Sequence, residues 1–345
     1  MKKELGIFVI LVVLCAVVAI LNPRFLSGAN LQNQARLIGM YGIFSIGMGL
    51  VIITGGIDLS VGSVFALQGV LLAIMLKGEV WYLPPQFVCN LINQVPGVAV
   101  SPVVMDWPWP WPLAVTATVL GTMAVGGMYG FLITRVRLQP FIVTLCGLLV
   151  YRGLARFIAD DEAKGFGNEG FGILRELATG TVFGVPMPFV VLVVIAVIMW
   201  VVLHRSVYGR HLFAVGRNED AARYSGINSR RVIASVYVVS AALTAIAGIL
   251  IAFYTNSISP SGHGNFYELY AIAGAVLGGC SFRGGEGSVI GIVIGTALLQ
   301  VLQNLVNLLG IPSSLNFAVM GAVILVGVLV DQILMQRRQR RLAKV

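Results

Sequence analysis

The chain has 345 residues, of which 58% are hydrophobic and only 11% are charged, and its formal net charge is +9. This much apolar surface exceeds what a water-soluble core could bury, so a soluble fold is excluded and lipid is the expected solvent. The basic residues lie between apolar segments, a pattern that a membrane imposes on loops, which argues against nucleic acid as a partner.

Ten apolar segments are expected to cross the membrane, because a hydrocarbon core about 30 Å thick needs roughly 20 apolar residues per helix. In chain order they are 6–21, 37–54, 60–77, 112–134, 140–158, 187–204, 232–254, 266–280, 286–309 and 315–334. The first follows Lys2 and Lys3 as a signal peptide would, but Leu21-Asn22-Pro23 lacks a small-x-small cleavage pattern, so we expect it to be retained. The sequence predicts an all-α membrane protein with one transmembrane domain over residues 1–345.

The distribution of Lys and Arg predicts the orientation of these spans. With the N-terminus in the cytoplasm and ten spans, most of the 23 basic residues lie on the cytoplasmic side, and the C-terminus is cytoplasmic as well. Two long segments, 78–111 and 159–186, are then external, and the longest cytoplasmic loop is 205–231. Missing one span would move the Arg-rich loop outside, against the charge rule.

The first informative segment is Thr54-Gly55-Gly56-Ile57-Asp58-Leu59-Ser60. A charge at the bilayer centre costs roughly 2.5 to 3.5 kcal/mol, so Asp58 is expected at a helix end, in a cavity or against a partner. Asp58 or Ser60 can cap the third span by accepting backbone N–H groups, while Gly55 and Gly56 end the second span. A contact with a solute or a partner protein is the alternative, and a capped turn at the inner mouth could also be part of a gate.

Two external features each allow two interpretations. Segment 78–111 is rich in Trp and Pro, which suits anchoring at the lipid headgroups or a rim that meets an external partner. Arg152 and Arg156 lie one turn apart near the outer end of the fifth span. Arg152 could contact a hydroxylated solute on a translocation path, or both side chains could extend outward to the headgroups.

The cytoplasmic loop 205–231 is amphipathic and is expected to contain a short helix. Asn218 suits an N-cap, Glu219 suits the positive first turn, and Gly226 suits the stop. The alternative is an ordinary positively charged loop. Further on, Gly278 and Gly279 precede Gly287, Gly291 and Gly295, whose spacing of four lays a small-residue stripe on one helix face for tight helix packing.

The sequence predicts no metal site and no catalytic constellation. Its three His residues show no HExxH spacing, its four Cys residues form no CxxC, and there is neither a GxSxG nor a GxxxxGK[ST] motif. An enzyme and a cofactor bound by this chain are therefore not expected. An ion-coupled carrier or a channel for a small polar solute stays open, although the charges gather at span ends rather than at the midplane.

Over most of its length the chain resembles the ribose/xylose-type permeases of ABC sugar importers. The matching pieces, in order, are Asn22-Pro23-Arg24-Phe25-Leu26-Ser27, the Asp58 turn, Pro140-Phe141-Ile142-Val143-Thr144-Leu145, Tyr151-Arg152-Gly153-Leu154-Ala155, the loop from Gly209 to Ile227, and the late glycine turn. The long Trp- and Pro-rich segment 78–111 departs from the family pattern, as do Cys280 and Arg283.

The resemblance implies a permease subunit in a bacterial inner membrane that imports a pentose or hexose. It implies three protein partners: an ATP-binding cassette protein that binds ATP and Mg²⁺, an extracytoplasmic sugar-binding protein, and a second permease subunit in a homo- or heterodimer. The residues implied to couple to the ATPase are Gly216, Asn218, Glu219, Ala221, Ala222 and Gly226. An ABC permease for a branched-chain amino acid is the alternative within this class.

Overall fold

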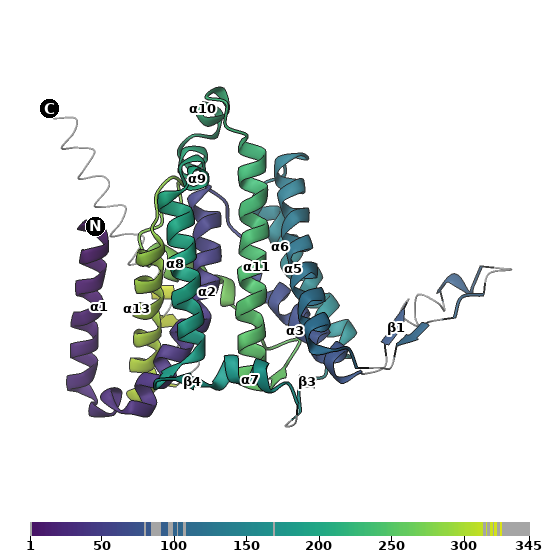
Figure 1. The fold of residues 1–345 in the computed structure, drawn as a ribbon, viewed down its shortest axis with the longest axis horizontal. Helices are drawn as coiled ribbons and strands as arrows, with labels where there is room; N and C mark the ends of the chain where they lie inside the picture. The colour runs from purple at the N-terminus through teal and green to yellow at the C-terminus, as the bar shows by residue number, and fades with distance from the viewer. Residues whose placement is uncertain are drawn as a thin grey trace.

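A computed structural model describes residues 2–312 except 79–80, 84–90, 96–98, 102, 106–107 and 168–169, and also 315, 318–319, 321–322 and 325. The helices are α1 (Lys2–Leu21), the 3-10 helix η1 (Pro23–Leu26), α2 (Gly28–Ile53), α3 (Val61–Lys77), α5 (Trp111–Thr134), α6 (Pro140–Ile158), α7 (Gly172–Thr179), α8 (Met187–Arg205), α9 (Val207–Arg217), α10 (Glu219–Tyr224), α11 (Ser229–Thr255), α12 (Tyr267–Leu277) and α13 (Val289–Leu308). The long helices run side by side in one bundle (Figure 1).

Three short antiparallel strand pairs accompany the helices. β1 (Trp81–Leu83) pairs with β2 (Val103–Met105), β3 (Lys164–Gly165) with β6 (Ser257–Ile258), and β4 (Thr181–Val182) with β5 (Val185–Pro186). The first pair lies within the predicted outer segment 78–111, and β3, β4 and β5 lie within the outer segment 159–186. The prediction of an all-α membrane class is confirmed in its coarse form, because these strands are only two or three residues long.

Seven of the described helices are long and apolar enough to cross a membrane: α1, α2, α5, α6, α8, α11 and α13. Their bounds lie close to the predicted spans, except that α2 begins at Gly28 instead of residue 37. The hydroxyl of Ser27 accepts the backbone N–H of Asn30 at 3.4 Å and so caps the helix. The first turns of α2 are polar, and hydropathy therefore does not indicate them. The tenth predicted span, 315–334, lies almost entirely outside the described residues.

The predicted span 266–280 is wrong in its extent. Its helix, α12, has 11 residues and rises only about 16 Å, which is half of what a hydrocarbon core requires. Helix α3 is also short, with 17 residues. The two short helices begin beside each other, since the rings of Phe65 and Tyr267 stack at 5.6 Å with an interplanar angle of 10°.

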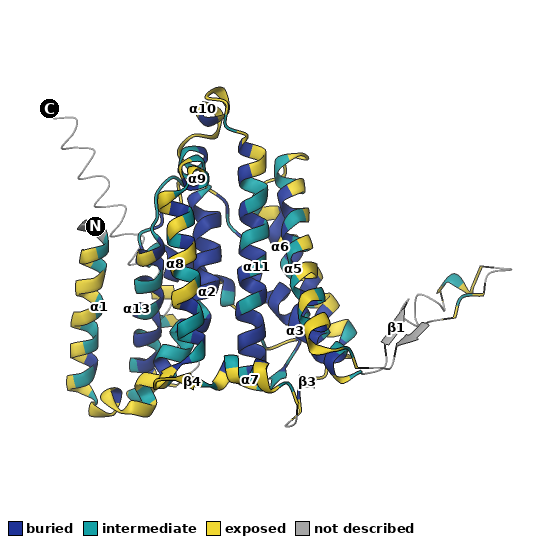
Figure 2. Cartoon of the chain, viewed as in Figure 1, coloured by how far each residue is buried: buried dark blue, intermediate teal, exposed yellow. Residues whose placement is uncertain are grey.

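Helices α2 and α11 form the centre of the bundle. In the most apolar stretch of each helix, 78% of the α2 residues and 72% of the α11 residues are buried. In α1, which lies at one side of the bundle, the share is 6% (Figures 1 and 2). Small residues bring α2 and α5 close to α11: a Cβ on Gly47 of α2 would lie 3.1 Å from the Ser240 hydroxyl, and one on Gly126 of α5 would lie 2.5 Å from the Tyr237 carbonyl. Such close approach is how helices pack in lipid, where apolar burial drives association only weakly.

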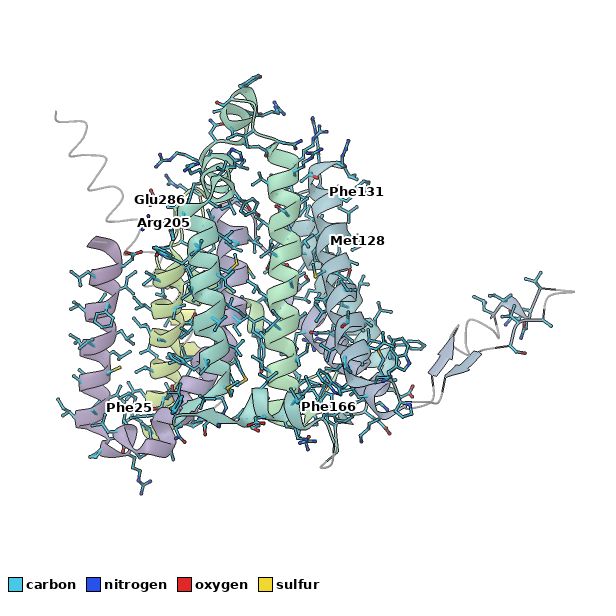
Figure 3. All side chains as sticks on the ribbon, viewed as in Figure 1. Phe25, Met128, Phe131, Phe166, Arg205 and Glu286 are labelled. Atoms are coloured by element: carbon cyan, nitrogen blue, oxygen red, sulfur yellow. The ribbon has the colours of Figure 1, made fainter. Side chains whose placement is uncertain are left out.

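The two ends of the bundle carry different segments. The loop with α9 and α10 lies at the same end as the start of α1, and Arg205 and Glu286 are there as well (Figures 1 and 3). The opposite end carries η1, α7 and β4, with Phe25 and Phe166 (Figures 1 and 3). The predicted coupling loop 205–231 and the predicted outer segment 159–186 therefore lie at opposite ends of the helices.

Candidate functional site

The three segments singled out in the sequence meet at the α9 end of the bundle, in what we call the glycine junction: Ile53, Gly55, Gly216, Gly284 and Gly285. The backbone N–H of Gly285 donates to the carbonyl of Ile53 at 2.8 Å. A Cβ on Gly216 would lie 1.8 Å from that carbonyl oxygen, and a Cβ on Gly284 would lie 2.5 Å from the Gly216 oxygen. Only glycine allows three backbone segments to approach this closely.

Backbone conformation also requires glycine at this junction. The φ angles of Gly55, Gly284 and Gly285 are +82°, +77° and +73°, in the left-handed region that other residues rarely adopt. Gly55 lies directly after the C-cap of α2, and Gly284 and Gly285 turn the chain between α12 and α13. The end of α2, the end of α9 and the late turn are consequently joined through their main chains.

The predicted coupling segment contains α10, and this helix begins and ends at the residues that the sequence indicates. The side chain of Asn218 accepts the N–H of Ala221 at 2.9 Å, and Gly226, with φ +84°, lies just beyond the end of the helix. The carboxylate of Glu219 accepts the hydroxyl of Ser229 at 2.9 Å, and Ala222 is buried. Helix α10 is therefore fixed to the start of α11.

The sequence reasoning did not identify α9, a second helix in the same loop. The hydroxyl of Ser206 caps it by accepting the N–H of Gly209 at 3.2 Å. A serine three residues ahead of this N–H was the available signal. On α10, the exposed side chains include Asp220 and Arg223, which form an ion pair at 2.9 Å, and Tyr224.

Asp58 is buried directly ahead of α3. Its Oδ1 accepts both the N–H of Ser60, at 2.9 Å, and the hydroxyl of Ser60, at 2.7 Å. Ser60 occupies the N-cap position, but its side chain makes no capping bond. Of the two predicted caps, the Ser60 side chain makes none, whereas Asp58 accepts the backbone N–H of Ser60, the N-cap residue of α3, in a tight turn. Gly56, in the same turn, leaves room for the hydroxyl of Tyr237, which would lie 2.6 Å from an added Cβ.

Three tyrosines surround the Asp58 turn, and the sequence reasoning missed all of them. Tyr129 of α5 contacts Tyr151 of α6 and Tyr237 of α11, with ring centroids 6.3 and 6.4 Å apart, and all three interact electrostatically with Asp58. We call Asp58, Ser60 and these tyrosines the polar centre. Tyrosine within an apolar span, away from the interface where it is usually found, was the available signal.

Arg152 lies against the non-helical segment 259–266, which precedes α12. Its Nη1 donates to the carbonyls of Pro260 and His263 at 2.8 and 2.7 Å, and the side chain is half-buried. It also interacts electrostatically with Glu268, a buried carboxylate in the first turn of α12. The sequence placed Arg152 on a translocation path or at the headgroups, whereas its guanidinium binds protein backbone; Glu268, a lone acid in an apolar segment, was overlooked.

The late glycines fall into two groups. A Cβ on Gly291 would lie 2.1 Å from the Gly278 oxygen, and one on Gly295 would lie 2.3 Å from the Gly274 oxygen, so these positions join α13 to α12. Gly287 precedes α13 and lies against Ile53, whereas Gly279 has φ +90° and a Cβ there would make only an ordinary van der Waals contact, with Ile7 at 3.7 Å. The stripe on α13 therefore begins at Gly291, and Gly279 serves the turn rather than helix packing.

Outside the spans, Asp161 lies 2.6 Å from the guanidinium of Arg156, and this pairing lowers the pKa of the Asp161 carboxyl. Both side chains are more than half exposed. Within the described part of the chain, no three His, Cys, Asp or Glu side chains gather closely enough to hold a metal ion.

Comparison with known proteins places this architecture in a family. Residues 30–328 match the family described as "Branched-chain amino acid transport system / permease component". The ribose import permease protein RbsC of Bacillus subtilis is 37% identical over 96% of this chain and 93% of its own length. RbsC of Escherichia coli K12 is 35% identical over 93% and 91% of the two chains, and the L-arabinose transport system permease protein AraH of the same strain is 31% identical over 95% and 90%.

No solved structure matches the chain. The family match covers well over half of the sequence, and the relatives are aligned over nearly the full length of both chains. Together with the long apolar helices, these matches show that the chain belongs to the family of branched-chain amino acid transport system permease components and is a multi-pass inner-membrane ABC permease.

Proposed function

We propose that this chain is the permease subunit of an ATP-driven importer that translocates a pentose delivered by an extracytoplasmic binding protein. The observation that carries the proposal is the glycine junction, which connects the α9–α10 loop directly to the backbone that leads to the Asp58 turn. The ribose and L-arabinose permeases among the relatives favour a pentose over a hexose.

ATP hydrolysis belongs to a partner in this proposal. The 345 residues contain no GxxxxGK[ST] phosphate-binding loop. A cassette protein that holds ATP and Mg²⁺ would dock on α9 and α10, where Asp220, Arg223 and Tyr224 are exposed. A second permease subunit, identical or homologous, would complete the pathway.

The α9 end of the bundle faces the cytoplasm in this arrangement. Arg205, Arg210 and Arg217 lie in or next to α9, and Arg230 and Arg231 open α11. Positive charge of this density is retained on the cytoplasmic side during insertion. The segment 159–186 at the opposite end would then meet the binding protein.

Transport would proceed by alternating access. Closure of the cassette dimer on ATP displaces the α9–α10 loop, and the glycine junction passes this displacement to the end of α2 and to the late turn. The Asp58 turn follows directly after the end of α2, so its movement would open or close the inner mouth. Two discrete packings of the bundle, biased by ATP and by the loaded binding protein, are sufficient for this cycle.

The deciding experiment uses the complete complex in proteoliposomes with labelled ribose, arabinose, glucose and leucine as competing solutes. We expect ATP-dependent uptake of a pentose, and loss of ATPase stimulation by loaded binding protein when Glu219 and Gly226 are both replaced. Full stimulation in that variant would contradict the coupling assignment. Uptake by the chain alone without ATP would instead show a secondary carrier or channel, and preference for leucine would show an amino acid permease.

A further inference from the structure

The non-helical segment 259–266 lies inside the bundle rather than at its end. It leads from β6, which pairs with β3 at the α7 end, to the start of α12. A Cβ on Gly62, at the start of α3, would lie 1.9 Å from the carbonyl oxygen of Gly264. From this contact α3 runs 17 residues toward the α7 end, while α12 runs 11 residues toward the glycine junction. Gly264 therefore lies at the depth of the hydrocarbon core.

Part of this segment is exposed at that depth. Ser261, Gly262 and Asn265 are exposed, and 46% of the Phe266 surface is accessible. Lipid cannot satisfy the hydrogen bonds of irregular backbone, so such a segment occurs at membrane depth only where it faces protein or a water-filled path. The exposed polar side chains therefore require water or a polar partner.

Internal bonds hold the segment in one conformation. Arg152 donates to the carbonyls of Pro260 and His263, and the imidazole Nδ1 of His263 accepts the N–H of Ser259 at 2.8 Å. The Asn265 side chain donates to the Ser261 carbonyl at 2.7 Å. A loop fixed in this way presents its exposed groups without a further ordering cost when a solute binds.

The chemistry of the exposed groups suits a neutral solute with several hydroxyls. Ser261 offers a hydroxyl and Asn265 an amide, while Phe266 adds an apolar ring for the C–H face of a sugar. The nearby charged groups are otherwise engaged, since Arg152 is bonded to carbonyls and Glu268 is buried. A zwitterionic amino acid would find no exposed charge of either sign on this segment.

We infer that residues 259–266 line the translocation path and that Ser261, Asn265 and Phe266 contact a neutral polyhydroxylated solute as it passes. The inference rests on the proposed import function and adds the residues that meet the solute. Cysteine accessibility tests it without transport. Asn265→Cys and Ser261→Cys are each placed in a chain whose native cysteines are replaced, and a small hydrophilic methanethiosulfonate is applied to the complex in membranes.

The matched control is Val197→Cys, on the exposed apolar face of α8. We expect the hydrophilic reagent to modify both loop cysteines but not the α8 cysteine, and saturating ribose to slow the loop reactions. In uptake assays, Asn265→Ala should raise KM about tenfold with little change in kcat, and Asn265→Gln should restore part of the affinity.

Three outcomes would overturn the inference: loop cysteines that react only with hydrophobic reagents, loop cysteines that cross-link two permease subunits, or protection by leucine but by no sugar. Failure of the wild-type complex to import a pentose would refute the proposed function. The accessibility of the loop and its protection by other polyols would still decide the inference in that case.

Discussion

The guanidinium nitrogen Nη1 of Arg152 lies 2.7 Å from the carbonyl oxygen of His263, and the same nitrogen also reaches the carbonyl of Pro260. These carbonyls belong to a segment of turns outside any helix, at the depth of the membrane core. Because lipid offers no donors, a side chain must supply them, and an arginine from α6 does so. The non-helical segment before α12 therefore depends on a residue far away in sequence.

Replacing Arg152 by Met should destabilise the protein by about 1 to 3 kcal/mol, because two carbonyls inside the bundle lose their donor while the volume of the side chain is kept. Unfolding in mixed micelles measures this change. Arg156→Met is the matched control one turn further along α6, where the guanidinium is exposed and pairs with the exposed Asp161. We expect little change there, since exposed ion pairs contribute little. Equal effects of the two variants would contradict the structural importance of Arg152.

Gly216→Ala tests the glycine junction. Alanine favours helix α9 itself by about 1 kcal/mol, but its Cβ would lie 1.8 Å from the Ile53 carbonyl and must push α9 away from α2. We expect the cassette protein to co-purify normally, whereas uptake per ATP hydrolysed falls about tenfold, within the usual range of coupling energies. Gly121→Ala, on α5, is the control because its Cβ would meet no atom within 4 Å. Unchanged uptake in Gly216→Ala would exclude transmission through this contact.

The sequence predicted the long spans and α3 well but made α12 too long, for a physical reason. Hydropathy reports how apolar a segment is, and length then decides whether it can cross the membrane. Residues 266–280 are apolar except for Glu268, yet the helix is confined to Tyr267–Leu277. Phe266, with φ +64°, and Gly279, with φ +90°, adopt left-handed conformations on either side of it. Apolar composition contains no information about such a break.

In the candidate site, features that depend on neighbouring residues were predictable from the sequence, and contacts between distant segments were not. The N-cap of α10 was predictable because Asn218 and Ala221 are three residues apart, and capping depends on neighbours in the chain. The contacts of Gly216 with Gly285, and of Gly56 with Tyr237, join segments that are distant in sequence. Each segment was recognisable by its composition, but their meeting follows only from the packing of α2 and α11.

Asn30 and Asn304 provide a test of polar contacts between helices. The side-chain amide of each donates to the other's oxygen, at 3.1 and 2.8 Å, which joins the start of α2 to α13. A double-mutant cycle with Asn30→Ala and Asn304→Ala should give a coupling of about 0.6 to 1.7 kcal/mol, the range for such bonds between membrane helices. The measurement is unfolding in mixed micelles.

A control cycle pairs Asn30→Ala with Thr118→Ala, whose hydroxyl donates to the carbonyl of Val115 within α5. That cycle should be additive to within about 0.5 kcal/mol. Additive behaviour of Asn30 and Asn304 themselves would mean that each amide finds another partner once the first is lost, and that the pair does not hold α2 against α13.

The orientation of the bundle can be tested with two exposed residues at its opposite ends. Phe183, at the turn between β4 and β5, is fully exposed, and Tyr224, at the end of α10, is 84% exposed. With the native cysteines replaced, Phe183→Cys should react with an impermeant maleimide on intact spheroplasts. Tyr224→Cys should react only after the membrane is permeabilised, since the arginines around α9 hold that end in the cytoplasm.

The opposite labelling pattern would place the α9–α10 loop outside, where no cytoplasmic ATPase could dock on it, and would refute both the charge-based orientation and the proposed coupling. Labelling of both cysteines on intact spheroplasts would mean that the described helices between them do not alternate sides. Residues 183 and 224 are separated by a single long helix, α8, so their labelling tests one crossing directly and does not depend on the remaining spans.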